Sequence, residues 1–250
     1  MKQFKKKNGI PKTLCFGALR STNITAKELA KTEKEDFVII AKRQTQGRGT
    51  KGRSFSSTRG GVYLTAVFYY ESFAAKDAFL VMAKSATAVC RTLEDYGFSP
   101  KIKWPNDVYV EDKKICGILI ENVFSGGLIS RSEIGIGLNV KNHLPKELRP
   151  IATTMTTLSK GRFSVKEVTE KLLGYLCGQF DFSEYQSRVG YLGTSQTLLQ
   201  GERREEVTPL RVNEDGSLSV LATDGERRVF AAEVSLRLNE AKTEETVRGI

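Results

Sequence analysis

A long loop constrains the fold of this chain more than any other feature. Residues 44–61 are rich in glycine and arginine and contain almost no aliphatic side chain. Short apolar runs flank the loop, Phe37 to Ala41 and Gly61 to Tyr70, and their β-branched and aromatic residues predict strands. Long loops in compact domains are often functional, and we expect this one to be mobile. The chain must therefore build a sheet in which such a loop joins two strands.

Part of the loop matches two nucleotide-binding motifs. Residues 47–52 read G-R-G-T-K-G, which fits the G-x-G-x-x-G dinucleotide fingerprint, and residues 47–54 resemble a P-loop. Both motifs need a helix directly after the glycines, whereas a strand is predicted here, and Arg53 stands where a P-loop needs lysine. Neither fold is favoured. The glycines with Arg48, Lys51 and Arg53 suit an anionic ligand. A solvated basic loop without a ligand is the alternative.

Periodicity and turn signals predict the other elements. Helices are predicted after Ser21 or Thr22, either of which can cap the first one, over residues 79–93, and after the capping box that begins at Ser164. Further strands are predicted at residues 101–104, 108–110, 115–123 and 134–140. From about residue 195, short alternating segments with Asp-Gly turns predict a small all-β module. We therefore expect a large domain over residues 1–193, a small β domain over 194–240 and a frayed tail over 241–250.

The charge balance leaves two classes of function open. The 250 residues include 39 Lys and Arg against 29 Asp and Glu, a net charge of +10. This surplus suits a nucleic-acid binder or an enzyme that handles anions such as ATP. No apolar run reaches the roughly 18 residues that a membrane span needs, and no signal-peptide pattern follows the basic N-terminus.

Cysteine and histidine usage argues against a zinc site and against a Ser-His-Asp hydrolase. The cysteines at positions 15, 90, 116 and 177 form no C-x-x-C pair, and His143 is the only histidine. We interpret the cysteines as buried, reduced thiols of a cytoplasmic protein. His143 precedes a proline by two residues and is expected in a loop.

A second motif gives the loop a chemical context. Residues 103–107 read K-W-P-N-D, in which Pro105 fixes a turn and Trp104 is expected in the core beside the site. Alone, this pentapeptide could be a strand-end turn with an exposed lysine. The combination is more specific, because five motifs follow in order. They are S-T-N at 21–23, the loop at 44–53, K-W-P-N-D, K-I-C-G-I-L-I-E at 114–121 and G-I-G-L-N-V at 135–140.

This ordered set resembles the biotin–protein ligase family, which shows S-T-N, G-R-G-x-x-G-R, K-W-P-N-D, K-x-x-G-I-L-x-E and G-I-G-x-N in the same order. The resemblance covers residues 19–142 strongly and the C-terminal module loosely, through residues 233–237. It implies an α+β fold, a mixed β-sheet flanked by helices like class II aminoacyl-tRNA synthetase catalytic domains, followed by a small SH3-like β-barrel. It also implies ATP-dependent activation of biotin to biotinyl-5′-AMP and transfer to a lysine of a biotin carboxyl carrier protein. Mg²⁺ would accompany ATP, and a homodimer is compatible with the family.

The resemblance implies roles for individual residues. Lys103 matches a lysine that contacts the biotin carboxylate and the phosphate, and Arg48 joins it as a catalytic residue. The residues implied for biotin binding are Ser21, Thr22, Asn23, Gln44, Gly47, Arg48, Gly49, Thr50, Lys103 and Gly117. Those implied for ATP and the adenylate are Arg48, Thr50, Arg53, Phe55, Asn106 and Asn139. The chain departs from some relatives at Thr50, where they carry arginine, and at Phe55, where they carry tryptophan.

The chemistry of adenylate formation agrees with these residue types. A carboxylate must attack the α-phosphorus of ATP, and both groups are anions, so cations and backbone donors are needed and no protein nucleophile is required. Lys103, Arg48 and Arg53 can supply the cations. Asp107 could either orient Lys103 or assist the acceptor amine in the second step.

Two other functions fit less well. A lipoate–protein ligase has a related fold and similar chemistry, but its pattern has an arginine-rich G-G-G loop and lacks K-W-P-N-D. Some biotin–protein ligases are also repressors with an N-terminal winged helix. The residues before Ser21 are too few for that domain, so we expect no sequence-specific DNA binding and no membrane association.

Overall fold

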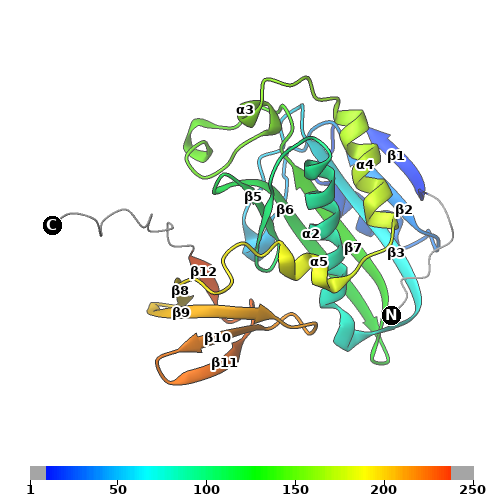
Figure 1. The fold of residues 1–250 in the computed structure, drawn as a ribbon. Helices are drawn as coiled ribbons and strands as arrows, with labels where there is room; N and C mark the ends of the chain where they lie inside the picture. Colours follow the sequence, from blue (N-terminus) through cyan, green and yellow to red (C-terminus); the bar gives the residue numbers. More distant parts are fainter. Residues whose placement is uncertain (1–9, 238–250) are drawn as a thin grey trace. The chain divides into compact units, whose positions relative to one another are not determined.

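The structure, a computed structural model, describes residues 10–237 (Figure 1). Contacts within the chain divide it into two compact units, Met1–Gly190 and Tyr191–Ile250. The sequence predicts this boundary after residue 193, and the tail predicted over residues 241–250 lies outside the described residues. Each unit contains a sheet of its own.

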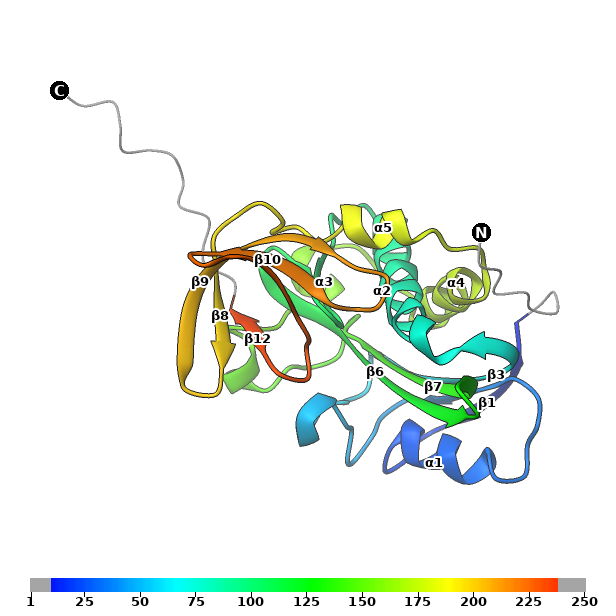
Figure 2. The ribbon, with the colours of Figure 1, turned by 90° about the horizontal axis from the view of Figure 1, so that it is seen from below.

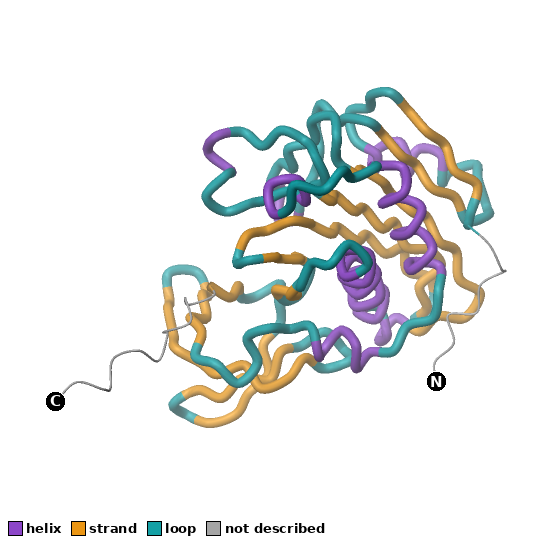
Figure 3. The backbone as a smooth tube through the Cα atoms, turned by 45° about the horizontal axis from the view of Figure 1, so that its top comes forward, coloured by secondary structure: helices purple, strands orange, loops and turns teal. Residues whose placement is uncertain are grey.

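A seven-stranded sheet forms the first unit, in the order β1-β2-β3-β7-β6-β5-β4 (Figure 3). β1 runs parallel to β2 and every other neighbouring pair is antiparallel, so the sheet is mixed. β2 is buried almost throughout, as its apolar sequence predicts. The strands are β1 (Lys12–Phe16), β2 (Phe37–Ala41), β3 (Val62–Ala74), β4 (Lys101–Lys103), β5 (Asp107–Val110), β6 (Lys113–Ser125) and β7 (Leu128–Leu138).

Helices cover both faces of this sheet (Figure 2). α1 (Thr22–Leu29) packs against β2, β3 and β7 on one face. On the other face, α2 (Phe79–Glu94) contacts both α4 (Val165–Cys177) and α5 (Phe182–Ser187). Short helical turns complete the unit, and these are η1 (Thr50–Gly52), η2 (Ala75–Asp77), η3 (Lys146–Leu148) and α3 (Met155–Leu158).

The element ends follow signals in the sequence. Ser164 caps α4, because its Oγ accepts a hydrogen bond from the backbone N–H of Glu167 at 3.4 Å. α2 ends before Gly97, whose φ of 80° favours glycine. Glu111 and Asp112 also adopt positive φ, which allows the tight turn between β5 and β6.

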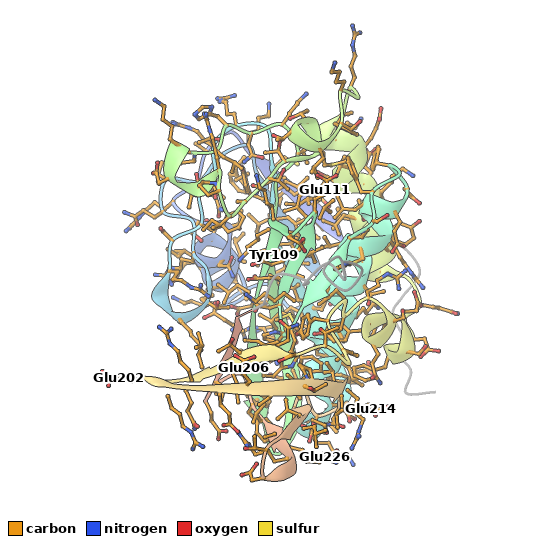
Figure 4. The ribbon with its side chains drawn as sticks, turned by 60° about the vertical axis from the view of Figure 1, so that its left-hand side comes forward. Tyr109, Glu111, Glu202, Glu206, Glu214 and Glu226 are labelled. Carbon is orange, nitrogen blue, oxygen red and sulfur yellow. The ribbon has the colours of Figure 1, made fainter. Side chains whose placement is uncertain are left out.

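The second unit is a small antiparallel sheet in the order β11-β10-β9-β8-β12. Gly216 and Gly225, both with positive φ, lie in the predicted Asp-Gly turns. Figure 4 labels several of its glutamates, among them Glu206, Glu214 and Glu226. The strands are β8 (Gln196–Gln200), β9 (Arg203–Val212), β10 (Leu218–Ala222), β11 (Gly225–Val229) and β12 (Ser235–Arg237).

The predicted architecture is confirmed: a mixed sheet flanked by helices precedes a small antiparallel module of the SH3-like kind. Several short elements were not predicted, among them β1, α3 and α5. Leu14 and Phe16 of β1 alternate and pack against core residues, but the strand has only five residues and none of them is fully buried. α5 has only six residues. Trp104 is buried as expected. In the described part of the chain, no helix is long and apolar enough to cross a membrane.

The cysteines correct one expectation. All four are free thiols, and Cys90 and Cys116 are buried as predicted. Cys177 is only half-buried and Cys15 is exposed, so the prediction of buried thiols is wrong for these two. Cys15 lies on the edge strand β1, which has a neighbouring strand on one side only. His143 is an exposed loop residue, as expected.

Candidate active site

One face of the first sheet gathers most of the predicted site residues. Directly paired residues on neighbouring strands point to the same face, so the register defines a row across five strands. The row consists of Tyr63, Gly137, Gly117, Asp107 and Lys103. With a strand spacing of about 4.8 Å, it extends roughly 19 Å. Gly135, two residues before Gly137, lies against Asn23 of α1. The row is therefore on the face that α1 covers.

Three glycines, Gly117, Gly135 and Gly137, form a glycine floor at the centre of this face. A Cβ atom at Gly137 would stand 2.5 Å from the Phe55 ring, and one at Gly135 would stand 2.6 Å from Oδ1 of Asn23. A Cβ atom at Gly117 would be 3.2 Å from the same Phe55 ring. Real side chains do not approach this closely at the first two positions, so the floor depends on glycine there.

The glycine- and arginine-rich loop folds into a short hairpin, which we call the flap (residues 47–55). The backbone N–H of Gly49 donates to the carbonyl of Arg53 at 2.7 Å, and that of Phe55 donates to the carbonyl of Gly47 at 2.9 Å. Its turn has positive φ at Lys51. No helix follows the glycines, so the flap is not a P-loop. Figure 2 shows this connection, in light blue, on the same side of the sheet as α1.

Gln44 joins the base of the flap to the start of α1. Its Nε2 donates to Ser57 Oγ at 2.8 Å, and its Oε1 accepts from the backbone N–H of Thr22 at 2.8 Å. The Thr22 hydroxyl lies 3.1 Å from the same oxygen. Thr65 Oγ1, in β3, is within hydrogen-bond distance of both Thr22 Oγ1 (2.9 Å) and Asn23 Oδ1 (3.1 Å). The structure thus brings these predicted biotin residues into one network.

Two polar atoms in this region have no hydrogen-bond partner, Ser21 Oγ and Asn23 Nδ2. Their residues are only 1% and 5% exposed. Ser21, one of the two predicted candidates, occupies the N-cap position of α1, but its side chain makes no capping hydrogen bond. A buried polar group without a partner costs about 1–3 kcal/mol, and a ligand can supply the missing partner. Ser21 and Asn23 are therefore candidate ligand contacts.

The other end of the row is cationic. Lys114 Nζ forms an ion pair with Asp107 Oδ1 at 2.6 Å. Lys103 Nζ lies 5.7 Å from the centre of the ring of Tyr109, which Figure 4 labels. Burial is the main cause that lowers the pKa of Lys103, the charges of Lys114 and Arg53 lower it further, and Asp107 opposes them. Three cations and one carboxylate therefore share this region, and the surplus of positive charge suits an anionic ligand.

Tyr109 and Lys103 are both partly withdrawn from water. Burial raises the pKa of Tyr109 to about 12, so its hydroxyl keeps its proton at neutral pH. Charges interact more strongly in such a desolvated setting than at an open surface. Lys103 is therefore placed to act on an anion more strongly than an exposed lysine would.

The remaining predicted residues lie on the flap or at strand ends. Arg48 is exposed on the flap, and Thr50 Oγ1 accepts a hydrogen bond from Arg53 Nη2 at 3.2 Å. Asn106 Nδ2 donates to the carbonyl of Ile118 at 2.8 Å, and Asn139 Oδ1 accepts from Asn142 Nδ2 at 3.0 Å. Asn106 therefore supports the backbone of β6, whereas Asn139 is paired with another side chain. In the described part of the chain, no hydrogen bond joins the side chain of Arg48, Asn106 or Asn139 to the glycine floor.

Sequence reasoning did not single out several residues of this face. Among them are Thr65, Lys114, Gly135 and Gly137. Lys114 begins the K-I-C-G-I-L-I-E motif, and both glycines belong to G-I-G-L-N-V, so the motifs contained the signal. Nothing in the sequence marked Thr65, which depends on strand register.

Comparisons with known proteins agree with this geometry. The model of the biotin/lipoate A/B protein ligase family matches residues 16–139. The bifunctional ligase/repressor BirA of Bacillus subtilis is 28% identical over 235 residues, which cover 87% of this chain and 72% of the relative. The biotin–[acetyl-CoA-carboxylase] ligase of Paracoccus denitrificans is 32% identical over 126 residues, 48% of this chain and 51% of the relative.

A solved structure shares nearly the whole fold. The biotin protein ligase from Aquifex aeolicus, in complex with biotin and ATP, superimposes with a TM-score of 0.77 and 27% identity. It covers 91% of this chain and 99% of its own. The family resemblance predicted from the motifs is confirmed. The chain therefore belongs to the biotin–protein ligases of the biotin/lipoate A/B protein ligase family.

Proposed function

We propose that this site activates biotin with ATP to biotinyl-5′-AMP and then transfers biotin to a lysine of a biotin carboxyl carrier protein. One observation carries the proposal: buried, unpartnered polar atoms of Ser21 and Asn23 share a sheet face with the cations of Lys103 and Lys114. Gly135 lies beside Asn23, and Gly117 lies on the neighbouring strand, displaced by two residues along it. The two glycines are therefore roughly 8 Å apart. This spacing suits a ligand with a neutral polar head and a carboxylate at its other end.

In the first step, a biotin carboxylate oxygen attacks the α-phosphorus of ATP. A new P–O bond forms, the bond to the β-phosphate oxygen breaks, and pyrophosphate leaves. Lys103, Lys114 and Arg53 supply positive charge beside the reacting anions, and the backbone donors of the flap add to it. The flap then covers the adenylate and keeps water from this reactive anhydride. Arg48 is the principal contact between the flap and the phosphate of the adenylate.

In the second step, the neutral amine of the acceptor lysine attacks the carbonyl carbon of biotinyl-AMP. An amide bond forms, the bond to the phosphate oxygen breaks, AMP leaves, and the proton lost by the amine passes to solvent water. Because Asp107 is already ion-paired with Lys114, we assign it to holding the cations in place rather than to deprotonating the amine. We expect the reaction in the cytoplasm, where thiols stay reduced.

The family implies Mg²⁺ with ATP, and the residues do not form a site for it. Among the described residues there is no group of three His, Cys, Asp or Glu side chains that could hold a metal ion. Asp107, the carboxylate in the row, is occupied by Lys114. A magnesium ion would therefore have to arrive with the nucleotide phosphates.

The discriminating experiment compares biotin with lipoate. Turnover of ATP labelled at the α-phosphate should yield a labelled adenylate with biotin in the absence of a carrier domain. Adding the carrier domain should consume the adenylate and release AMP. A lipoate–protein ligase of related fold is the remaining alternative. Adenylate formation with lipoate and none with biotin would establish it and refute the proposal.

A further inference from the structure

Basic residues without acidic partners surround the candidate site. From Lys42 to Tyr70 the chain contains no Asp or Glu, and the next acidic residue is Glu71. Its basic residues in this stretch are Lys42, Arg43, Arg48, Lys51, Arg53 and Arg59. Neither these nor Arg20 lies within ion-pair distance of a carboxylate in the described part of the chain. This concentration of unpaired positive charge requires an explanation beyond folding.

Arg20, Lys42 and Arg43, which we call the rim cations, lie beside the ligand residues. Two backbone hydrogen bonds join the segment around Arg20 to the segment around Arg43. The N–H of Leu19 donates to the carbonyl of Arg43 at 3.2 Å, and the N–H of Gln46 donates to the carbonyl of Arg20 at 2.8 Å. All three side chains are exposed, whereas the neighbouring Ser21 and Gln44 are buried and half-buried. The same two segments therefore turn ligand-binding groups inward and cations outward.

Adenylate formation does not need the rim cations. Lys103, Lys114 and Arg53 already concentrate positive charge at the row of site residues. Exposed charges of one sign repel each other, but they raise the local concentration of an oppositely charged partner. The rim cations therefore suit a partner whose surface carries carboxylates or phosphates.

The second step of the reaction brings such a partner to this place. The acceptor lysine must reach the adenylate, so the protein surface around that lysine comes against the edge of the site. A single-stranded nucleic acid would use aromatic side chains among the cations. Phe55 is the only aromatic residue between Lys42 and Arg59, and its ring lies against the glycine floor. These features favour an acidic protein surface over a nucleic acid.

We propose that the rim cations dock an acidic patch of the acceptor protein, next to its target lysine. This inference rests on the proposed function for the existence of the acceptor step. Attraction between exposed charges acts mainly on association, so the rim cations govern the KM for the acceptor and its salt dependence. They leave the formation of biotinyl-AMP unchanged.

The test compares two double charge reversals. The rim variant is Lys42→Glu/Arg43→Glu. The matched control is Lys76→Glu/Lys166→Glu, which changes the net charge equally at exposed lysines before α2 and on α4. Adenylate formation is measured by biotin-dependent exchange of pyrophosphate into ATP, and transfer is measured with the biotin-accepting domain of a carboxylase at low and high salt.

The rim variant should form adenylate at the wild-type rate, while its KM for the acceptor domain rises about ten-fold or more at low salt. Near 1 M salt, where the Debye length is about 3 Å, the difference should nearly vanish. The control should match the wild type. Equal KM values in the rim variant and the control would overturn the inference, and so would a loss of adenylate formation in the rim variant. If the rim variant lost duplex-DNA binding with no change in its KM for the acceptor domain, the rim cations would be assigned to nucleic-acid binding instead. Whether the wild-type protein forms adenylate tests the proposed function separately from the docking of the acceptor.

Discussion

Gly135→Ala tests whether the contact between the glycine floor and α1 holds the end of the site that is proposed to bind biotin. The new Cβ atom would stand 2.6 Å from Oδ1 and 2.8 Å from Nδ2 of Asn23, whereas ordinary contacts begin near 3.4 Å. The amide must therefore retreat by about 0.8 Å. It cannot do so freely, because Asn23 is 5% exposed and its Oδ1 lies 3.1 Å from Thr65 Oγ1.

Gly135→Ala should lower the kcat/KM for biotin strongly and the stability of the fold only slightly. A displacement of about 1 Å in a positioned group costs about 10²-fold in rate, which corresponds to roughly 2.7 kcal/mol of transition-state stabilisation. Overpacking the contact should lower the free energy of unfolding by about 1–3 kcal/mol. The kcat/KM for biotin should therefore fall about 10²-fold in a protein that remains folded.

Biotin-dependent pyrophosphate exchange measures kcat/KM for each substrate, and urea unfolding measures stability. Gly137→Ala is the matched comparison, since its Cβ atom would meet the Phe55 ring at 2.5 Å. Phe55 is predicted to contact the adenylate, so this variant should impair the use of ATP more than that of biotin. The reasoning about Asn23 would be refuted if Gly135→Ala had the wild-type kcat/KM for biotin. It would also be refuted if kcat/KM fell equally for biotin and for ATP.

Three further predictions concern the cations. Lys114→Ala and Lys103→Ala should each slow adenylate formation about 10²–10³-fold, measured with labelled ATP; a variant as fast as the wild type would remove that lysine from the proposed chemistry. Because burial lowers the pKa of Lys103, adenylate formation should decline on the alkaline side at a lower pH than an ordinary lysine would cause. Lys103→Arg should retain the charge and abolish this decline, and an unchanged pH profile would contradict the assignment. Biotin with ATP should protect the flap from trypsin at Arg48, Lys51 and Arg53, and Arg48→Ala should release adenylate that labels lysines indiscriminately. Equal cleavage with and without ligands would rule out closure of the flap.

The sequence predicts the elements whose signals are local. β2 is an apolar run, α2 has helical periodicity, and Ser164 caps α4 as its capping box indicates. β1 was not predicted because it is a five-residue edge strand whose apolar alternation is limited to Leu14 and Phe16, neither of them fully buried. Ser21 or Thr22 was expected to cap α1; Ser21 occupies the N-cap position, but its hydroxyl does not form the capping hydrogen bond, which is worth about 1 kcal/mol.

The motifs of the site could be predicted from the sequence, but the contacts between side chains of different elements could not. K-W-P-N-D and the S-T-N motif identified most of the polar residues. The ion pair of Asp107 with Lys114 depends on the register between β5 and β6, which contains a bulge. The role of Thr65 depends on β3 meeting α1. Such contacts follow from tertiary structure, which a linear pattern does not encode.

The contact between Asn23 and Gly135 has a consequence for how the enzyme is made. These residues are about 110 positions apart in the chain. At roughly 5–20 residues per second, a ribosome needs about 5–20 s to pass from one to the other. During that interval α1 has no glycine floor to face, because β7 joins the sheet between β3 and β6 only after it has been synthesised. The proposed site is therefore complete only once β7 has been synthesised and the central strands have paired.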